Sequence, residues 1–348
     1  MVVTDAISRR NKILETVIDS YVSTATPVGS FTVSKKYRIG LSPATIRNVM
    51  VELEKLGYIA HPHTSAGRVP TDKGYRYYVD TLMELKHLTE EEREFIEKNL
   101  TQDLDELEDI IRRTARAIST LTKQTSLISF PRAKKRTFKR LELISTSAAK
   151  IHALLFTAQG VVKHSIFELQ ENIEERELSR ISKFLNEELL GLPLSEIKDH
   201  LLGKILSEND PFHHLFKQAI DILNLSRLLE EKNEKILLDG THHIIEQPEF
   251  RNTEKIKAIL KALEDEDEIL DILDEDLEEN VVKIHIGSEN PYEDIRECSI
   301  VVSNYKIGEE NIGGIGLIGP TRMDYSKVVS VIEYVGQIFS RSLARLGE

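Results

Sequence analysis

The chain has 348 residues, a formal net charge of −12 and 40% hydrophobic residues, which is enough for two or three domains with real cores. Its single cysteine, Cys298, excludes an internal disulfide and a cysteine zinc cluster, so we expect a reducing compartment. The N-terminal residues lack the basic-then-apolar order of a signal peptide, and no apolar run approaches the roughly 18 residues of a spanning helix. These features predict a soluble, cytoplasmic protein without membrane contact.

Two helices are expected at the start of the chain. Apolar pairs recur every four residues along 5–23, which predicts a first helix. The run Thr26-Pro27-Val28-Gly29 breaks it, and Ser30 is a suitable cap for a short second helix that ends near Tyr37. A turn at 39–41 then leads into the most informative segment.

The third predicted helix carries the clearest boundaries. Ser42 can cap its first turn, Pro43 fits the first helical position, and Gly57 suits the left-handed residue that ends a helix. Apolar residues recur at three- and four-residue steps and form one stripe: Ile46, Val49, Met50, Leu53 and Leu56. The opposite face is polar and basic near its start: Ala44, Arg47, Asn48, Val51 and Lys55, with Thr45 at its border. Taken alone, such a helix is also typical of an ordinary amphipathic surface helix.

The residues that follow favour a nucleic-acid-binding unit. Tyr58 to Ala60 predicts a strand, 61–68 a loop with Pro62 and Gly67, and Val69 a returning strand. Thr71 can cap a fourth helix. Helix, helix, turn, helix, strand, loop and strand in this order are typical of a winged helix-turn-helix. Residues 1–80 are therefore predicted to form a DNA-binding domain.

Charge supports this assignment. Residues 1–80 contain 11 Lys or Arg and 7 Asp or Glu, a net charge of +4, so the remainder of the chain carries −16. Because DNA affinity depends on neutralising phosphates with cations, only the N-terminal segment is a plausible docking surface for double-stranded DNA.

The predicted DNA contacts lie on the third helix and its hairpin. Arg47 and Asn48 are the expected base readers, because Arg and Asn side chains suit guanine and adenine edges. Arg68 is the expected contact to the backbone or minor groove. The full predicted set is Ser42, Ala44, Thr45, Arg47, Asn48, His63, Ser65, Arg68 and Lys73.

Residues 81–130 are predicted to form a helical connector. A leucine and isoleucine stripe runs along 88–125, and Thr89 with Glu92 forms a capping box at its start. The following run 132–140, RAKKRTFKR, holds six basic residues in nine. We interpret it as a solvated turn before a strand, with a second DNA contact as the alternative.

An α+β domain is expected in the rest of the chain. Alternation predicts strands within 141–169, a helix follows at 173–190, and further strands are predicted at 281–286, 299–305 and 315–318 before a closing helix at 325–346. Strands on both sides of a helical middle suggest one domain interrupted by an insertion. We place the α+β domain at 131–194 and 276–348 and the insertion at 195–275.

Three further patterns predict no chemistry. The segment 264–279 has 11 acidic residues in 16 but lacks the glycine of a calcium loop, so it is interpreted as a solvated acidic helix. The G-x-G-x-x-G of 314–319 is interpreted as a strand rather than a dinucleotide site, because Pro320 follows it at once. The histidines lack metal-binding spacing, and no catalytic constellation is present. We therefore expect no enzyme, no cofactor and no metal.

Two long motifs carry a resemblance to a known family. The run SPATIRNVMVELEKLGYIAHPHTSAGRVPTDKGYRYYVD from Ser42, and GLIGPTRMDYSKVVSVIEYV from Gly316, resemble the heat-inducible transcription repressor HrcA family, and the resemblance extends over essentially the whole chain. It implies a winged helix-turn-helix followed by a GAF-like domain with an inserted dimerisation domain. It also implies a dimeric cytoplasmic repressor that binds an inverted-repeat operator of chaperone genes and depends on a GroEL-type chaperonin.

Two functions follow from the sequence. The first is a repressor of heat-shock genes that loses activity on heating unless chaperonin refolds it. The alternative is a winged-helix regulator controlled by a small molecule in the GAF-like domain. A metabolite that shifts operator affinity would favour the alternative, whereas temperature and chaperonin dependence without a ligand would favour the first.

Overall fold

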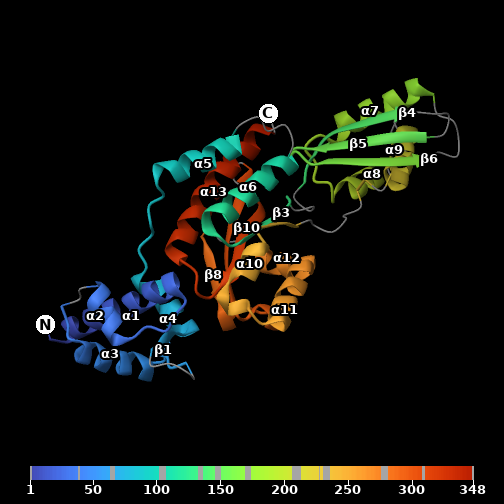
Figure 1. Cartoon of the computed structure of the whole chain (residues 1–348). Helices are drawn as coiled ribbons and strands as arrows, with labels where there is room; N and C mark the ends of the chain where they lie inside the picture. The colour runs from blue at the N-terminus through green and yellow to red at the C-terminus, as the bar shows by residue number, and fades with distance from the viewer. Residues whose placement is uncertain are drawn as a thin grey trace.

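The protein is a mixed α+β, multidomain molecule, seen here in a computed structural model. Figure 1 shows three regions: a cluster of N-terminal helices at one end, a sheet with helices on both faces in the middle, and a smaller sheet with helices at the other end. The structure describes residues 2–37, 40–62, 67–101, 107–131, 136–145, 150–168, 174–205, 213–226, 228–229, 236–275, 281–307 and 310–346.

The N-terminal region, which we call the head, comprises the described residues up to Leu82. Its elements are α1 (Val2–Thr24), α2 (Ser30–Tyr37), α3 (Pro43–Lys55), β1 (Ile59–Ala60), β2 (Val69–Pro70), α4 (Asp72–Tyr77) and the π-helical turn η1 (Tyr78–Leu82). The expected start of α3 is confirmed, because Ser42 Oγ accepts the Thr45 N–H at 3.2 Å and Pro43 occupies the first turn. Its expected end is confirmed by Gly57, whose φ is +78°.

The hairpin β1–β2 lies against the start of α4 in the head. The close approach depends on Gly74, since a Cβ there would lie 2.0 Å from the Tyr58 carbonyl oxygen. Thr71 Oγ1 caps α4 by accepting the Gly74 N–H at 3.1 Å, as expected from sequence. Apolar residues of the helices and the hairpin form one buried core: Ile13, Leu14, Val17, Ile18, Val33, Ile46, Met50, Leu53, Ile59 and Tyr75.

The middle region is built on a five-stranded antiparallel sheet of order β7-β3-β10-β9-β8. The strands are β3 (Thr125–Ser129), β7 (Ile236–Asp239), β8 (Lys283–Ile286), β9 (Cys298–Ile307) and β10 (Glu310–Pro320). The strands predicted near the C-terminus are thus confirmed as β8, β9 and β10. The G-x-G-x-x-G motif lies within β10, which confirms its interpretation as a strand.

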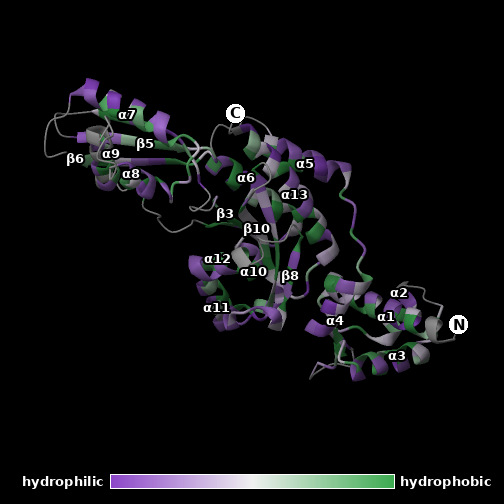
Figure 2. Cartoon of the chain, turned by 180° about the vertical axis from the view of Figure 1, so that it is seen from behind, coloured by the Kyte–Doolittle hydropathy of each residue, from purple (hydrophilic) through white to green (hydrophobic). Residues whose placement is uncertain are grey.

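Helices cover both faces of this sheet. One face carries α5 (Glu90–Thr101), α6 (Leu107–Thr122) and α13 (Tyr325–Leu346), and the other carries α10 (His242–Glu246), α11 (Thr253–Glu264) and α12 (Glu266–Glu275). The alternation of β9 explains the two layers, because Val301 joins the first core while Ile300 and Val302 join the second. Thr89 and Glu92 form the expected capping box of α5, which is largely hydrophilic in Figure 2.

The third region, which we call the distal unit, has its own sheet and core. Its sheet of order β4-β5-β6 contains β4 (Phe138–Ser145), β5 (Lys150–Thr157) and β6 (Val162–Glu168). Its helices are α7 (Glu175–Leu189), α8 (Ile197–Ile205) and α9 (His213–Ser226). Residues from one face of this sheet pack with the helices in a core separate from those of the central sheet.

The domain boundaries differ from the sequence-based expectation. Ser129 of β3 pairs with Ile236 of β7, so the chain leaves the central sheet and returns to it at neighbouring positions. The excursion therefore occupies 130–235 rather than 195–275, and residues 236–275 pack on the central sheet. Likewise α5 and α6 are layers of the middle region and not only a connector. Alternation identifies a strand but does not reveal which sheet it joins.

The acidic segment contains α12, so the expected helix is present, and its residues Ile269, Ile272 and Leu273 are buried. Residues 276–280 lie outside the described part of the chain. Across the residues that the structure describes, helices long and apolar enough to cross a membrane are absent.

Candidate nucleic-acid interface

The open face of α3 is the first element of the candidate site. Ile46, Met50 and Leu53 turn one side of the helix into the core of the head. On the other side Arg47 and Asn48 are exposed, and neither makes a hydrogen bond or ion pair with the described part of the chain. Both side chains are therefore available to a ligand. Ala44, Val51 and Lys55 complete the exposed face, as expected from sequence.

The start of α3 adds a positive end to this face. The first turn contains no acidic residue, and the free N–H groups of a helix N-terminus attract anions. Ser42 and Thr45 are both committed to the cap, since their hydroxyl oxygens lie 2.9 Å apart and Ser42 Oγ accepts the Thr45 N–H. Their expected contacts with DNA remain predictions.

The hairpin is fixed to the helices beside α3. The backbones of Val28 and Arg68 exchange two hydrogen bonds of 2.8 and 2.9 Å, which attach the returning strand to the segment between α1 and α2. Gly67 permits this approach, because a Cβ there would lie 2.6 Å from the Pro27 carbonyl carbon. The predicted contacts His63 and Ser65 lie outside the described residues, so their roles stay predictions.

Arg68 has a partner within the head that the sequence did not indicate. Its Nε and Nη2 donate to Glu54 Oε2 of α3 at 3.0 and 2.9 Å, and the side chain is only 17% exposed. The guanidinium therefore bridges the hairpin and α3, and its expected contact with the DNA backbone or minor groove stays a prediction. Glu54 was not identified as functional, because it lies 14 residues from Arg68 and no local spacing signals the pair.

Lys73 is also engaged within the head. Its Nζ donates to the Leu56 carbonyl oxygen at 2.9 Å and lies 5.3 Å from the centre of the Tyr58 ring. The ammonium thus satisfies a carbonyl at the C-terminal end of α3, where a cation is favoured by the helix dipole. The expected contact of Lys73 with DNA stays a prediction. Arg47 and Asn48 lie on the open face of α3 and have no partner within the described part of the chain.

A first prediction separates a bridging role of Arg68 from a direct phosphate contact. If the pair orients the hairpin, Arg68→Ala and Glu54→Gln should each weaken binding to duplex DNA, and the double variant should be no worse than either single variant, because coupled partners are not additive. The slope of affinity against salt should remain that of the unaltered protein. The measurement is a fluorescence-anisotropy titration of duplex DNA at several salt concentrations.

A direct contact between Arg68 and a DNA phosphate would give a different result. A direct phosphate contact would lower the salt slope by about one counterion in Arg68→Ala. It would also leave Glu54→Gln binding more tightly, since that change removes a competing anion. Lys12→Ala is the matched control, because the Lys12–Glu15 pair at 2.8 Å is an exposed ion pair within α1.

Comparisons with known proteins give matches over nearly the whole chain. Residues 108–329 match the family model described as HrcA protein C terminal domain. The heat-inducible transcription repressor HrcA of Desulforamulus reducens is 38% identical over 97% of this chain and 97% of its own length. The repressors of the same name from Syntrophobacter fumaroxidans and Geobacter sulfurreducens are each 36% identical, over 99% and 97% of this chain and 99% and 98% of their own lengths.

A solved structure has the same overall arrangement. The crystal structure titled as a hypothetical protein at 2.2 Å resolution superimposes with a TM-score of 0.67 at 26% identity, over 97% of this chain and 98% of that one. With near-complete coverage by curated relatives above 30% identity, the chain belongs to the HrcA family of heat-inducible transcription repressors, and its activity is the repression of transcription rather than catalysis.

Proposed function

We propose that this protein represses chaperone operons by binding an inverted-repeat operator through the head, which acts as a winged helix-turn-helix. The observation that carries the proposal is the open basic face of α3, with Arg47 and Asn48 exposed and unpaired within the described chain. A helix of this kind enters the major groove with its N-terminal residues at the base edges. The hairpin β1–β2 beside it takes the place of the wing.

The central sheet with its two helical layers is the GAF-like domain of this proposal. It holds the head at one end and the distal unit at the other (Figure 1). The excess negative charge of the chain beyond residue 80 disfavours nucleic acid and anionic membranes there, which directs DNA to the head. We place the repressor in the cytoplasm, where its operator is.

A second prediction tests base reading. Arg47→Ala and Asn48→Ala should each weaken operator binding by ~1–3 kcal/mol, because each removes side-chain hydrogen bonds to a base edge. Binding to random duplex should change much less for Asn48→Ala, which keeps the charge of the head. Electrophoretic shift titrations with operator and scrambled DNA make the measurement, with Glu52→Ala on the same helix as control. Either variant binding the operator as tightly as the unaltered protein would remove that residue from the reading set.

We infer that the distal unit is the dimerisation domain. Its inner sheet face is covered by α7 to α9, whereas its outer face presents apolar side chains to solvent: Ile144, Val162 and Ile166 are 47%, 55% and 54% exposed. Leu154 and Phe156 of β5 lie between them on the same face. A two-fold repeat of this face would bury it, and an inverted-repeat operator requires two heads related by a two-fold axis.

A third prediction concerns this dimer. Replacing residues 131–234 with Asn-Gly should connect β3 to β7 by a short turn, because Ser129 and Ile236 are already paired. We expect a monomer in sedimentation and an operator affinity lower by roughly 10²–10⁴, the usual range for lost bivalency. The full-length Val162→Glu/Ile166→Glu variant keeps the distal unit and should also be monomeric. A stable dimer in both proteins would relocate the interface.

We propose that heat inactivates the repressor by unfolding and that a GroEL-type chaperonin restores it. Stability is a small difference between large terms, so modest warming can change the folded fraction sharply. Unfolding would expose the strands of the central sheet, which are apolar on both faces, and such strands are the surface that a folding chamber sequesters. Heat also unfolds other proteins, and these then occupy the chaperonin. The repressor is no longer refolded, so repression is lost.

A fourth prediction uses Cys298 to report unfolding. This thiol is fully buried in β9, and burial raises its pKa to about 12, so it should resist alkylation at neutral pH. On heating, iodoacetamide labelling should rise over the same temperature range in which operator binding is lost. Cooling with chaperonin and ATP should restore both protection and binding. Loss of binding while Cys298 stays protected would contradict the folding switch and favour control by a small molecule.

A further inference from the structure

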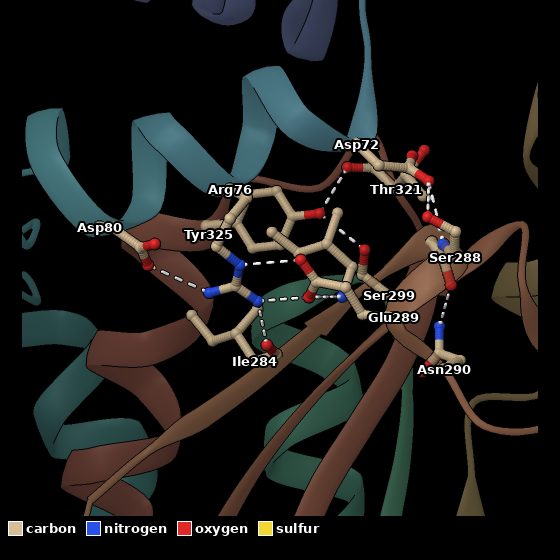
Figure 3. A network of polar contacts seen from close by, with 12 residues as sticks. Asp72, Arg76, Asp80, Ile284, Ser288, Glu289, Asn290, Ser299, Thr321 and Tyr325 are labelled. Carbon is tan, nitrogen blue, oxygen red and sulfur yellow. Dashed lines mark hydrogen bonds and ion pairs between the residues drawn. The ribbon is translucent and has the colours of Figure 1, made fainter. Parts of the chain in front are cut away.

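Helix α4 of the head docks on the loop that follows the edge strand β8 of the central sheet (Figure 3). Arg76 makes a forked contact with Glu289, with Nε to Oε1 at 2.9 Å and Nη2 to Oε2 at 2.5 Å. Its Nη2 also donates to the Ile284 carbonyl oxygen, and Nη1 donates to Asp80 Oδ1 at 3.1 Å. Forked arginine–carboxylate pairs fix direction as well as distance, because both groups are planar.

A second contact lies one turn earlier on α4. Asp72 Oδ2 accepts hydrogen bonds from the N–H and the hydroxyl of Ser288, at 2.9 and 3.0 Å. Gly287 makes room for it, since a Cβ there would lie 2.3 Å from Asp72 Oδ2, and its φ of +56° is one that glycine tolerates best. The loop therefore fits against α4 through its backbone conformation as well as through charged contacts.

The receiving loop is held rigid from within the middle region. The buried Asn290 amide donates to the carbonyl oxygens of Gly287, Ile295 and Cys298 at 2.9, 3.3 and 2.7 Å. Glu289 Oε2 also accepts the Ile286 N–H at 2.8 Å. Burial alone would raise the pKa of Glu289, but its hydrogen bonds with Arg76 and Ile286 outweigh this and lower the pKa. The carboxylate is thus charged at neutral pH.

Further contacts join the head to the middle region. Arg322 donates to the Val22 carbonyl oxygen at the end of α1, at 2.6 Å, and also pairs with Glu249. Lys86, just after the head, lies 2.5 Å from Asp324 Oδ2. The buried Tyr75 and Tyr325 rings lie 5.7 Å apart, so the cores of the head and the middle region are continuous.

This docking leaves the open face of α3 free. In Figure 1, α3 lies on the side of the head away from the central sheet, and Arg47 and Asn48 are exposed in the docked arrangement. We propose that Asp72, Arg76 and Glu289 are positioning residues that hold each head at one orientation on the body, so that the two heads of a dimer meet the operator halves at one fixed separation. The proposal rests on the proposed DNA-binding function and extends it to the choice of operator spacing.

The docking itself can be tested without DNA. Spin labels at cysteines introduced for Glu52 in the head and Glu333 in α13, both exposed, report the head-to-body distance by double electron–electron resonance, and buried Cys298 stays unlabelled. Labelled chains diluted into unlabelled protein give the distance within one chain. We expect one narrow distribution for the starting protein and broad ones for Arg76→Ala, Glu289→Gln and Gly287→Ala.

Coupling and a matched control sharpen this measurement. The Arg76→Ala/Glu289→Gln double variant should be no broader than either single variant, because the two groups act through one contact. Arg112→Ala removes an exposed ion pair of 3.1 Å to Glu108 within α6 and should leave the distribution narrow. A distribution that stays narrow in all three docking variants would overturn the proposal.

The functional test compares a half-site with the full inverted repeat. In the docking variants we expect unchanged half-site affinity, a loss on the order of tenfold on the full operator, and a flatter response to added spacer base pairs, because preorganisation of two linked sites is lost. Equal losses on half-site and full operator would show damage to the head and overturn the positioning role, as would an unchanged spacing preference. If the starting protein binds neither DNA, the proposed function fails, and the distance measurement still decides the docking.

Discussion

The rest of the structure depends on a strand pair that is apolar on both faces. In β9 the side chains of Ile300, Val301 and Val302 alternate between two cores, and β10 pairs with it from Cys298 to Ile307. Such a pair must be covered on both sides, since exposed apolar area costs roughly 25 cal/mol per Å². The chain meets this requirement with helices from before and after the distal unit. The middle region is therefore assembled from segments far apart in sequence.

Local signals predicted much of the fold. The cap at Ser42, the left-handed Gly57 and the capping box at Thr89 are set by residues within four positions of each other, and all are present. The closing helix was predicted at its observed bounds, because its apolar period runs without interruption from Tyr325 to Leu346. Likewise Arg47 and Asn48 were placed correctly on the open face, because helical period alone determines which side of α3 they occupy.

The remaining features of the fold and the site depend on contacts between distant residues, which helical periodicity and capping motifs do not reveal. The strands within 141–169 were recognised as strands, but the sheet that they form became visible only through their pairing and their separate core. The ion pair of Arg68 with Glu54 spans 14 positions, and no local spacing indicates it. The contact of Asp72 with Ser288 spans 216 positions. A charged residue carries no local signal of a partner so far along the chain, so the docking surface was not predicted.

The pairing of β3 with β7 has a kinetic consequence. The two strands are joined by residues 130–235, so their hydrogen bonds form only after a long loop closes, and the entropy of closure rises with loop length. Contacts of high sequence separation also slow folding. During refolding, the β3 edge of the central sheet stays unpaired until the distal unit is compact enough to bring β7 back. An unpaired strand edge of that kind can pair with a strand of another chain. The longer the edge stays unpaired, the larger the fraction of the protein that aggregates at a given concentration.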